Sequence, residues 1–376
     1  HATARYIAAA SVVMLKNEPP RRGMRAPLPL HRGLRVALLG SACDAKSAFE
    51  VPSRRSYWAA GDYYVVGGSG RVFFNSSASV RSGLEAAGII VSYYDGDDVA
   101  QAAALMATAD VAIACGGAIT QESWDRPSLK LDQDEFLQSL VRATTARRAV
   151  GTLPPLVVTA LAPGVITADW AETVDAAVIV FLGGEQTGNA LADVLIGDIN
   201  PSGRLPVTLP MSEDDMVAPC PHQRCEYTER LNVGWRALHH QPVRFPFGHG
   251  LSFTEFEYAW AQRPQLMNAA NATITSDALN MSVVVTNTGL VAGAEVVQLY
   301  LQYPRDAGEP ALVLRGFAKT RQLAPAQRAT VLFTLSQRDI STWIPGIGWR
   351  IAHGDFGVMI GSSSRDERLS TDVSVD

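Results

Sequence analysis

The sequence has 376 residues and predicts two or three domains, because single hydrophobic cores stop growing at roughly 250–300 residues. Apolar residues make up 47% of the chain and charged residues 18%, as in an ordinary globular protein with a substantial core. The net charge of −5, with no Lys/Arg run longer than a pair, excludes the basic surface of a nucleic-acid-binding protein, and no apolar segment is long and uncharged enough to span a bilayer.

The first part of the chain alternates between two kinds of apolar pattern. Residues 4–15 begin with helical spacing, and a Pro-rich connector follows them. The expected strands are continuous apolar runs at 34–39, 89–94, 111–115, 155–160 and 176–182, and the expected helices lie at 80–87, 98–107, 132–147 and 188–197. This alternation is typical of βαβ units, so residues 1–215 are predicted to form an α/β domain with a doubly wound, mostly parallel sheet.

The pattern changes in the last part of the chain. Residues 216–275 are rich in Pro, His and aromatic residues without clear periodicity, and they are predicted to be a long loop and linker that packs on the first domain. In residues 276–376, segments such as AEVVQLYLQY alternate apolar and polar side chains and are separated by turn signals. This period of two predicts a small antiparallel β-sandwich.

The four cysteines are too few for a disulfide-dense scaffold. Cys43 and Cys115 lie in apolar, strand-like segments and are predicted to be buried thiols. Cys220 and Cys225 flank a short Pro-containing loop and are a candidate disulfide, whereas a metal site there is not expected.

Three sequons, at Asn75, Asn271 and Asn280, are candidate glycosylation sites and fit a secretory route. The protein is therefore expected to be secreted, extracellular or vacuolar. No signal peptide is visible, and the start at His1 is expected to result from processing or truncation.

The candidate chemistry follows the predicted strand 111–115. Gly116-Gly117 is expected to turn the chain out at the carboxyl edge of the sheet, where ligands bind in open α/β folds, so Glu122 is offered to a cleft. A Glu whose pKa is raised in a cleft can protonate a leaving oxygen. Glycoside hydrolysis generally needs a second carboxylate, however, and the sequence does not place one. Neither a G-x-S-x-G elbow nor a pair of His at helical metal-binding spacing occurs, which disfavours serine hydrolases and zinc enzymes.

A second glycine-rich segment, Gly67-Gly68-Ser69-Gly70, lacks both the G-x-G-x-x-G spacing and the Lys of a P-loop. A nucleotide cofactor is therefore not expected, and neither is any other cofactor. The segment fits better a loop that brings backbone and the Ser69 hydroxyl close to a polyhydroxy ligand.

Several motifs together resemble glycoside hydrolase family 3, in its β-glucosidase and β-xylosidase branch. In chain order they are SVVMLKNE, RVALLGSACD, GDYYVVGGSGRV, ITQESWDRPSL, GGEQTGNALADVLIGDINPSGRLPVTLP, RFPFGHGLSFTEFEY and the VTNTG, GAEVVQLYL and LRGFAK segments. The resemblance covers nearly the whole chain. It implies an α/β sandwich domain followed by a fibronectin-III-like domain, with the family's Asp nucleophile on an N-terminal barrel that this chain does not contain.

The resemblance also implies roles for single residues. The segment from Glu122 to Arg126 matches the family's Glu-Gly-x-Asp-Arg loop, so Glu122 is expected to be the acid/base. Ser69, with Gly68, would reach the sugar, and Asp125 and Arg126 would support the loop.

Three positions depart from the family pattern: Ser123 and Arg230 stand where Gly is usual, and Trp235 stands where Tyr is more common, between Gly234 and Arg236. An Arg230 side chain that filled the cleft would abolish activity.

Two functions follow from these observations. The first is the C-terminal part of a retaining β-glycosidase that acts on carbohydrate together with a barrel-containing chain or N-terminal half. The alternative is a non-catalytic structural or carbohydrate-binding module derived from such an enzyme.

Overall fold

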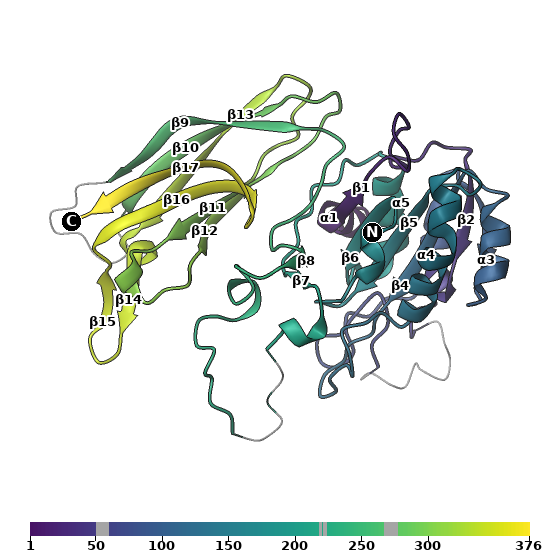
Figure 1. The fold of residues 1–376 in the computed structure, drawn as a ribbon, viewed down its shortest axis with the longest axis horizontal. Coiled ribbons are helices and arrows are strands. Elements are labelled where there is room, and N and C mark those ends of the chain that lie inside the picture. The colour runs from purple at the N-terminus through teal and green to yellow at the C-terminus, as the bar shows by residue number, and fades with distance from the viewer. Residues whose placement is uncertain (50–59, 218–219, 221–223, 267–276) are drawn as a thin grey trace. The chain divides into compact units, whose positions relative to one another are not determined.

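The computed structural model describes residues 1–49, 60–217, 220, 224–266 and 277–376 (Figure 1). Asn271 lies outside these residues. The chain forms two compact units whose segments interleave along the sequence. The first unit comprises His1–Gly203, Leu209–Glu213 and Gly250–Phe253, and the second comprises Arg204–Thr208, Asp214–His249 and Thr254–Asp376.

A six-stranded sheet forms the centre of the first unit. Its strands are β1 (Val13–Asn17), β2 (Arg35–Leu39), β3 (Ile90–Tyr94), β4 (Val111–Gly117), β5 (Leu156–Ala162) and β6 (Ala176–Phe181), in the order β1-β6-β5-β4-β2-β3. All neighbours are parallel except β1, which pairs antiparallel with β6 at the edge. The predicted doubly wound, mostly parallel sheet is confirmed.

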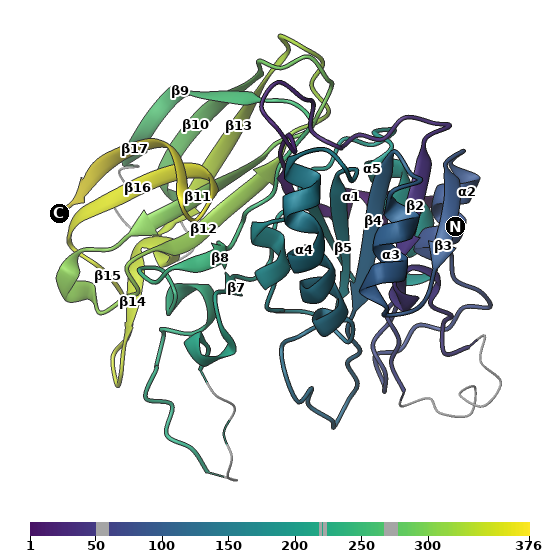
Figure 2. The ribbon, with the colours of Figure 1, turned by 45° about the vertical axis from the view of Figure 1, so that its right-hand side comes forward.

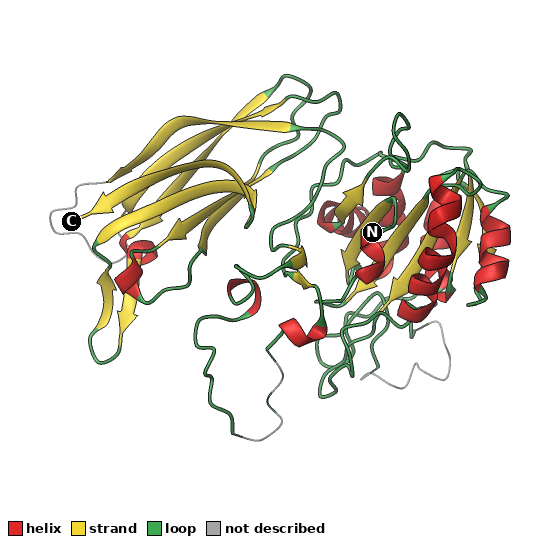
Figure 3. Cartoon of the chain, viewed as in Figure 1, coloured by secondary structure: helices red, strands yellow, loops and turns green. Residues whose placement is uncertain are grey.

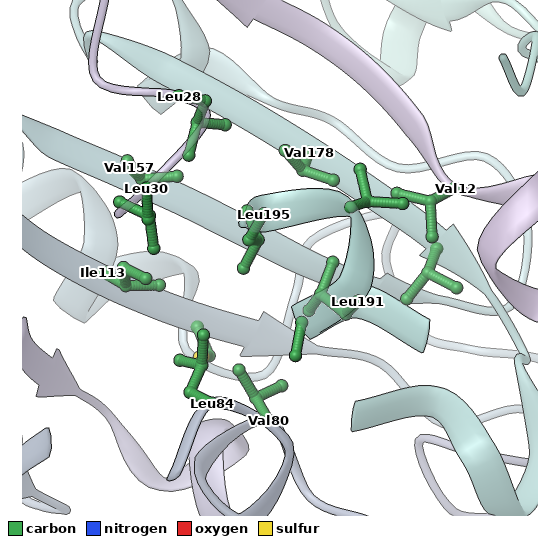
Figure 4. Close-up of a cluster of buried hydrophobic side chains, with 14 of the residues drawn as sticks. Val12, Leu28, Leu30, Val80, Leu84, Ile113, Val157, Val178, Leu191 and Leu195 are labelled. Carbon is green, nitrogen blue, oxygen red and sulfur yellow. The ribbon is translucent and has the colours of Figure 1, made fainter. Parts of the chain in front are cut away.

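Helices cover both faces of this sheet. They are α1 (Ala2–Ser11), α2 (Val80–Ala86), α3 (Val99–Met106), α4 (Asp134–Ala149) and α5 (Thr187–Leu195). Helices α1, α2 and α5 lie on one face and α3 and α4 on the other (Figures 1 and 2). Figure 4 shows the apolar layer beneath α2 and α5, where Ile113 and Val157 of the strands pack with Leu84, Leu191 and Leu195 of the helices. Burial of such aliphatic side chains is the main stabilising contribution to this unit.

The order of the strands defines where a ligand would bind. From β2 the chain passes outward to β3 and then crosses back to β4, on the other side of β2. The carboxyl ends of β2 and β4 therefore flank a topological switch point, where open α/β sheets bind ligands.

The prediction that Cys43 and Cys115 are free thiols is wrong, because they form a disulfide. Cys43 lies in the 3-10 turn Ser41–Asp44 that follows β2, and Cys115 lies in β4, which pairs with β2. The parallel register brings the two Cα atoms to 5.1 Å, although the cysteines are 72 residues apart. Both side chains are fully buried.

The second unit contains a three-stranded and a four-stranded antiparallel sheet (Figures 1 and 3). One sheet consists of β9 (Phe256–Leu266), β10 (Asp277–Asn287) and β13 (Arg328–Ser336). The other consists of β11 (Val296–Gln302), β12 (Val313–Lys319), β16 (Gly354–Ser363) and β17 (Asp366–Val375). Inward-facing residues of both sheets, such as Val283, Leu299 and Phe356, share one core. The predicted β-sandwich is confirmed.

The remaining strands of the chain are short: β7 (Leu209–Pro210), β8 (Val243–Phe245), β14 (Ser341–Ile344) and β15 (Gly348–Ile351).

The structure differs from the predicted loop and linker over residues 256–266, because these residues form β9 and pair with β10. Phe256 and Tyr258 are buried, whereas Glu257 and Ala259, which follow them in turn, are exposed. This short alternation is the pattern of a half-buried strand, and its continuation through polar residues and Pro264 obscured it in the sequence.

Among the described residues, none of the helices combines the length and the apolar character that crossing a membrane requires.

Candidate active site

Two loops at the carboxyl edge of the first sheet pair with each other. The Gly67 amide donates to Thr120 O at 3.0 Å, and the Glu122 amide donates to Gly67 O at 3.2 Å. Gly67 and Gln121 thereby form a parallel bridge. The segment that follows β4 is thus fixed against the glycine-rich loop, and the structure brings together the two segments that the sequence singled out.

Ser69 binds the Glu122 carboxylate through two donors. Its amide and its hydroxyl each lie 2.7 Å from Glu122 Oε2. These hydrogen bonds, the amide first, hold the pKa of Glu122 below its ordinary value. The sequence argument invoked a raised pKa, and the structure reverses this direction, because the exposed carboxylate gains two donors and almost no burial.

Gly68 makes this contact sterically possible. Its backbone has a φ of +94°, and a Cβ atom there would lie 2.4 Å from Glu122 Cβ and 2.7 Å from Glu122 Oε2. Any larger residue would push the carboxylate away from Ser69. Gly68 therefore shapes the site by approaching Glu122 closely.

The two departures in which another residue stands in place of Gly share a backbone conformation. Ser123 has a φ of 63° and Arg230 a φ of 50°, both in the left-handed region that glycine adopts without cost. The backbone at these positions thus keeps the conformation that favours Gly, although the residue differs. The Arg230 side chain is exposed.

The two residues expected to support the loop behave differently. Arg126 is half-buried and donates to Val165 O at 2.6 Å, which ties the loop to the segment after β5. Burial lowers the pKa of its guanidinium. Asp125 is exposed, and within the described part of the chain its carboxylate forms no hydrogen bond or ion pair.

Trp124 is an exposed aromatic residue near Glu122 in the sequence that the sequence argument did not single out. Its side chain is 58% exposed, and it lies two residues after Glu122. It lines a cavity of about 540 Å³, together with Gln121, Arg126, Lys130, Ile119 and Leu131. Small-molecule sites commonly measure about 300–1,000 Å³ and combine an apolar wall with a few polar groups. An aromatic residue inside the Glu-x-x-Asp-Arg segment was the signal that could have identified it.

The candidate modification sites also differ in their settings. Asn75 is exposed in a loop, whereas Asn280 is half-buried in β10, the middle strand of its sheet.

Cys220 and Cys225 form the second disulfide. No three His, Cys, Asp or Glu side chains gather in metal-binding geometry in the ranges that the structure covers.

Relatives of known name align with the chain over much or all of its length. Thermostable beta-glucosidase B of Acetivibrio thermocellus is 32% identical over 395 residues, which cover 100% of this chain and 48% of the relative. Probable beta-glucosidase D of Aspergillus niger is 34% identical over 270 residues, which cover 67% of this chain and 35% of the relative.

Solved structures give the same picture. The crystal structure of the beta-D-glucoside glucohydrolase from Trichoderma reesei matches with a TM-score of 0.84 and 28% identity, and the match covers 100% of this chain and 55% of that one. The chain thus spans about half the length of such relatives, or less. Its fold and its relatives place the chain in the class of proteins related to glycoside hydrolases, and the named relatives are themselves β-glucosidases.

Family models define the class more closely. Residues 12–253 match the glycosyl hydrolase family 3 C-terminal domain, and residues 295–364 match a fibronectin type III-like domain. The chain belongs to glycosyl hydrolase family 3.

Proposed function

We propose that this chain is the C-terminal part of a retaining β-glycosidase of the β-glucosidase type, in which Glu122 is the acid/base. The observation that carries the proposal is the position of Glu122, exposed on the loop after β4 at the switch point of the sheet and held by Ser69. The Asp nucleophile would be supplied by a barrel half, on the same precursor or on a separate chain.

The retaining reaction asks Glu122 to act twice. In the first step the protonated carboxyl gives its proton to the glycosidic oxygen while the nucleophile attacks the anomeric carbon, and the alcohol leaves. In the second step the Glu122 carboxylate takes a proton from the water that attacks the same carbon, and the sugar is released. The carboxylate bound to Ser69 is the form that the second step requires.

Trp124 would contact the aglycone on the leaving-group side. Its exposed ring and the apolar wall of the adjacent cavity suit stacking against a sugar or aryl group. Ser69 and Gly68 would approach the sugar from the other side of Glu122.

Substitution of Glu122 tests the proposal in the barrel-containing protein. Glu122→Ala should lower the turnover of an aryl β-glucoside by about 10²–10⁴-fold, because proton transfer by a positioned group contributes that much. Azide should restore turnover and yield the β-glycosyl azide, since the anion attacks the anomeric carbon of the glycosyl-enzyme without a base to activate it. Glu18→Ala, which removes an exposed carboxylate of the same unit, should leave turnover unchanged. Unchanged turnover of Glu122→Ala would refute the assigned role.

The alternative is a non-catalytic structural or carbohydrate-binding module. Ser123 and Arg230, in place of Gly, are the observations that favour it. Mass spectrometry of the native preparation separates the two functions, because the enzyme requires a barrel polypeptide at equal stoichiometry and the module does not.

A secretory route is proposed alongside this function. All four cysteines are in disulfides, which persist in oxidising compartments, and Asn75 offers an exposed sequon. A shift in mass on treatment with a glycosidase that removes N-linked glycans would support glycosylation at this position.

A further inference from the structure

The contact between Ser69 and Glu122 depends on a tight turn. The Arg71 amide donates to Gly68 O at 3.1 Å, so residues 68–71 form a turn with Ser69 at its second position. Ser69 itself is exposed, and its side chain contributes nothing to the core. The position of its hydroxyl must therefore come from residues at the base of the loop.

A buried carboxylate, that of Asp62, holds the two ends of this loop together. Asp62 is 4% exposed, and it accepts hydrogen bonds from the amides of Ala48 at 2.8 Å and of Tyr64 and Val65 at 2.9 Å. Its Oδ2 also lies 3.5 Å from Arg71 Nη2. The carboxylate thus joins the start of the loop to its end.

Arg71 closes the loop from the other side. Its side chain is 2% exposed, its guanidinium donates to Ala60 O, and it lies over the Phe49 ring, 4.1 Å from the centroid. A guanidinium buried this deeply stays charged, and Asp62 is the anion that compensates it. The segment with Gly68, Ser69 and Gly70 lies between Asp62 and Arg71 in the sequence. It is therefore anchored near both of its ends by this buried ion pair.

We propose that Asp62 and Arg71 are positioning residues for Glu122. Their buried ion pair fixes the turn over residues 68–71, and Ser69 on that turn holds the Glu122 carboxylate in place for proton transfer. Neither Asp62 nor Arg71 touches the carboxylate, and they act on it only through Ser69. The inference rests on the proposed function, in which Glu122 is the acid/base.

Titration of Glu122 in the 376-residue chain tests directly whether Asp62 and Arg71 act on Glu122 through Ser69. The chain is labelled with ¹³C at the glutamate carboxyl carbon, and the Glu122 signal is identified by its loss in Glu122→Gln. Ser69→Ala should shift the titration midpoint of Glu122 upward, because both the hydroxyl and the geometry of the turn contribute to binding the ionised carboxylate. Asp62→Asn should shift it in the same direction, although residue 62 does not contact Glu122.

Asp175→Asn is the matched control. Asp175 is also buried and paired with an arginine, Arg148, in the same unit. It directly precedes β6, however, and so lies at the amino ends of the strands, whereas Glu122 follows the carboxyl end of β4. It should destabilise the unit as Asp62→Asn does and leave the Glu122 midpoint unchanged. A general loss of stability would move all three variants alike, so the control separates positioning from a merely structural effect.

Two outcomes would overturn the proposal. One is an unchanged titration midpoint of Glu122 in Ser69→Ala, and the other is an equal midpoint in folded Asp62→Asn and Asp175→Asn. If Asp62→Asn does not fold, Arg71→Lys replaces it, since Lys keeps the charge and loses the planar guanidinium. An upward shift is then expected, and none would contradict the proposal. The titration needs no activity, so its failure is distinct from failure of the enzyme assay on Glu122→Ala.

Discussion

Ser123 occupies the position directly after Glu122 with a left-handed backbone, at a φ of 63°. A side chain there costs about 1–2 kcal/mol relative to the right-handed region, and Gly does not carry this cost. Gly loses more entropy on folding, by roughly 0.5–1 kcal/mol, which offsets part of the gain. The departure from the family pattern is thus a local strain next to the proposed acid/base.

Ser123→Gly should therefore stabilise the first unit by up to about 1 kcal/mol. The midpoint of urea unfolding should rise while Glu122 keeps its contact with Ser69. Ser139→Gly, in the interior of α4, should lower the midpoint, because Gly disfavours a helix. A loss of stability in Ser123→Gly would mean that the Ser123 side chain makes a contact worth more than the strain.

At the scale of single residues, the sequence predicted the position of Glu122 but not its contact with Ser69. A buried apolar strand followed by a loop predicted that Glu122 lies at the carboxyl edge, and β4 has that position. Ser69 is 53 residues earlier, and its contact depends on the bridge between Gly67 and Gln121. No periodicity records the pairing of two irregular loops, so the direction of the pKa shift could not be predicted either.

At the scale of elements, the disulfide between Cys43 and Cys115 joins the turn after β2 to β4. It crosses the switch point and closes a loop of 72 residues that contains the turn bearing Ser69. In the chain-entropy model, a cross-link over a loop of this length stabilises a protein by about 4 kcal/mol. The disulfide therefore contributes to the order of the edge that carries Glu122.

Replacement of both cysteines by Ala should lower the free energy of unfolding by about 3–4 kcal/mol, as measured by urea unfolding. The matched control replaces Cys220 and Cys225, whose separation is 5 residues, and should cost only about 2 kcal/mol or less. Equal losses in the two variants would show that loop length does not set the contribution of the disulfide to stability.

The elements themselves were predictable where local patterns are strong. The continuous apolar runs of β2, β4, β5 and β6 mark strands buried on both faces. In β10 and β11 every second residue, such as Val283 and Leu299, belongs to the core of the sandwich. The disulfide was not predictable, because Cys43 and Cys115 meet only through the register of β2 on β4. Likewise, the edge position of β1 results from its pairing with β6, which its own residues do not encode.

At the scale of the whole molecule, the two units have separate cores, one beneath the helices of the α/β sheet and one between the sheets of the sandwich. Relatives that match the full length of this chain are about twice as long. A retaining glycosidase needs two carboxyl groups about 5–5.5 Å apart, and the proposed function assigns only one of them to this chain. The proposed active site is complete only when the barrel half supplies the other.

The 376-residue chain alone should therefore release no 4-nitrophenol from 4-nitrophenyl β-D-glucoside above the buffer rate. Without a nucleophile no glycosyl-enzyme forms, so the first step of the retaining reaction cannot take place. A polypeptide that carries both the barrel and this chain should turn the substrate over, and the same polypeptide with Glu122→Ala should not. Turnover by the chain alone that disappears in Glu122→Ala would show that its described units already contain both carboxylates, and the division of the site between two halves would then be wrong.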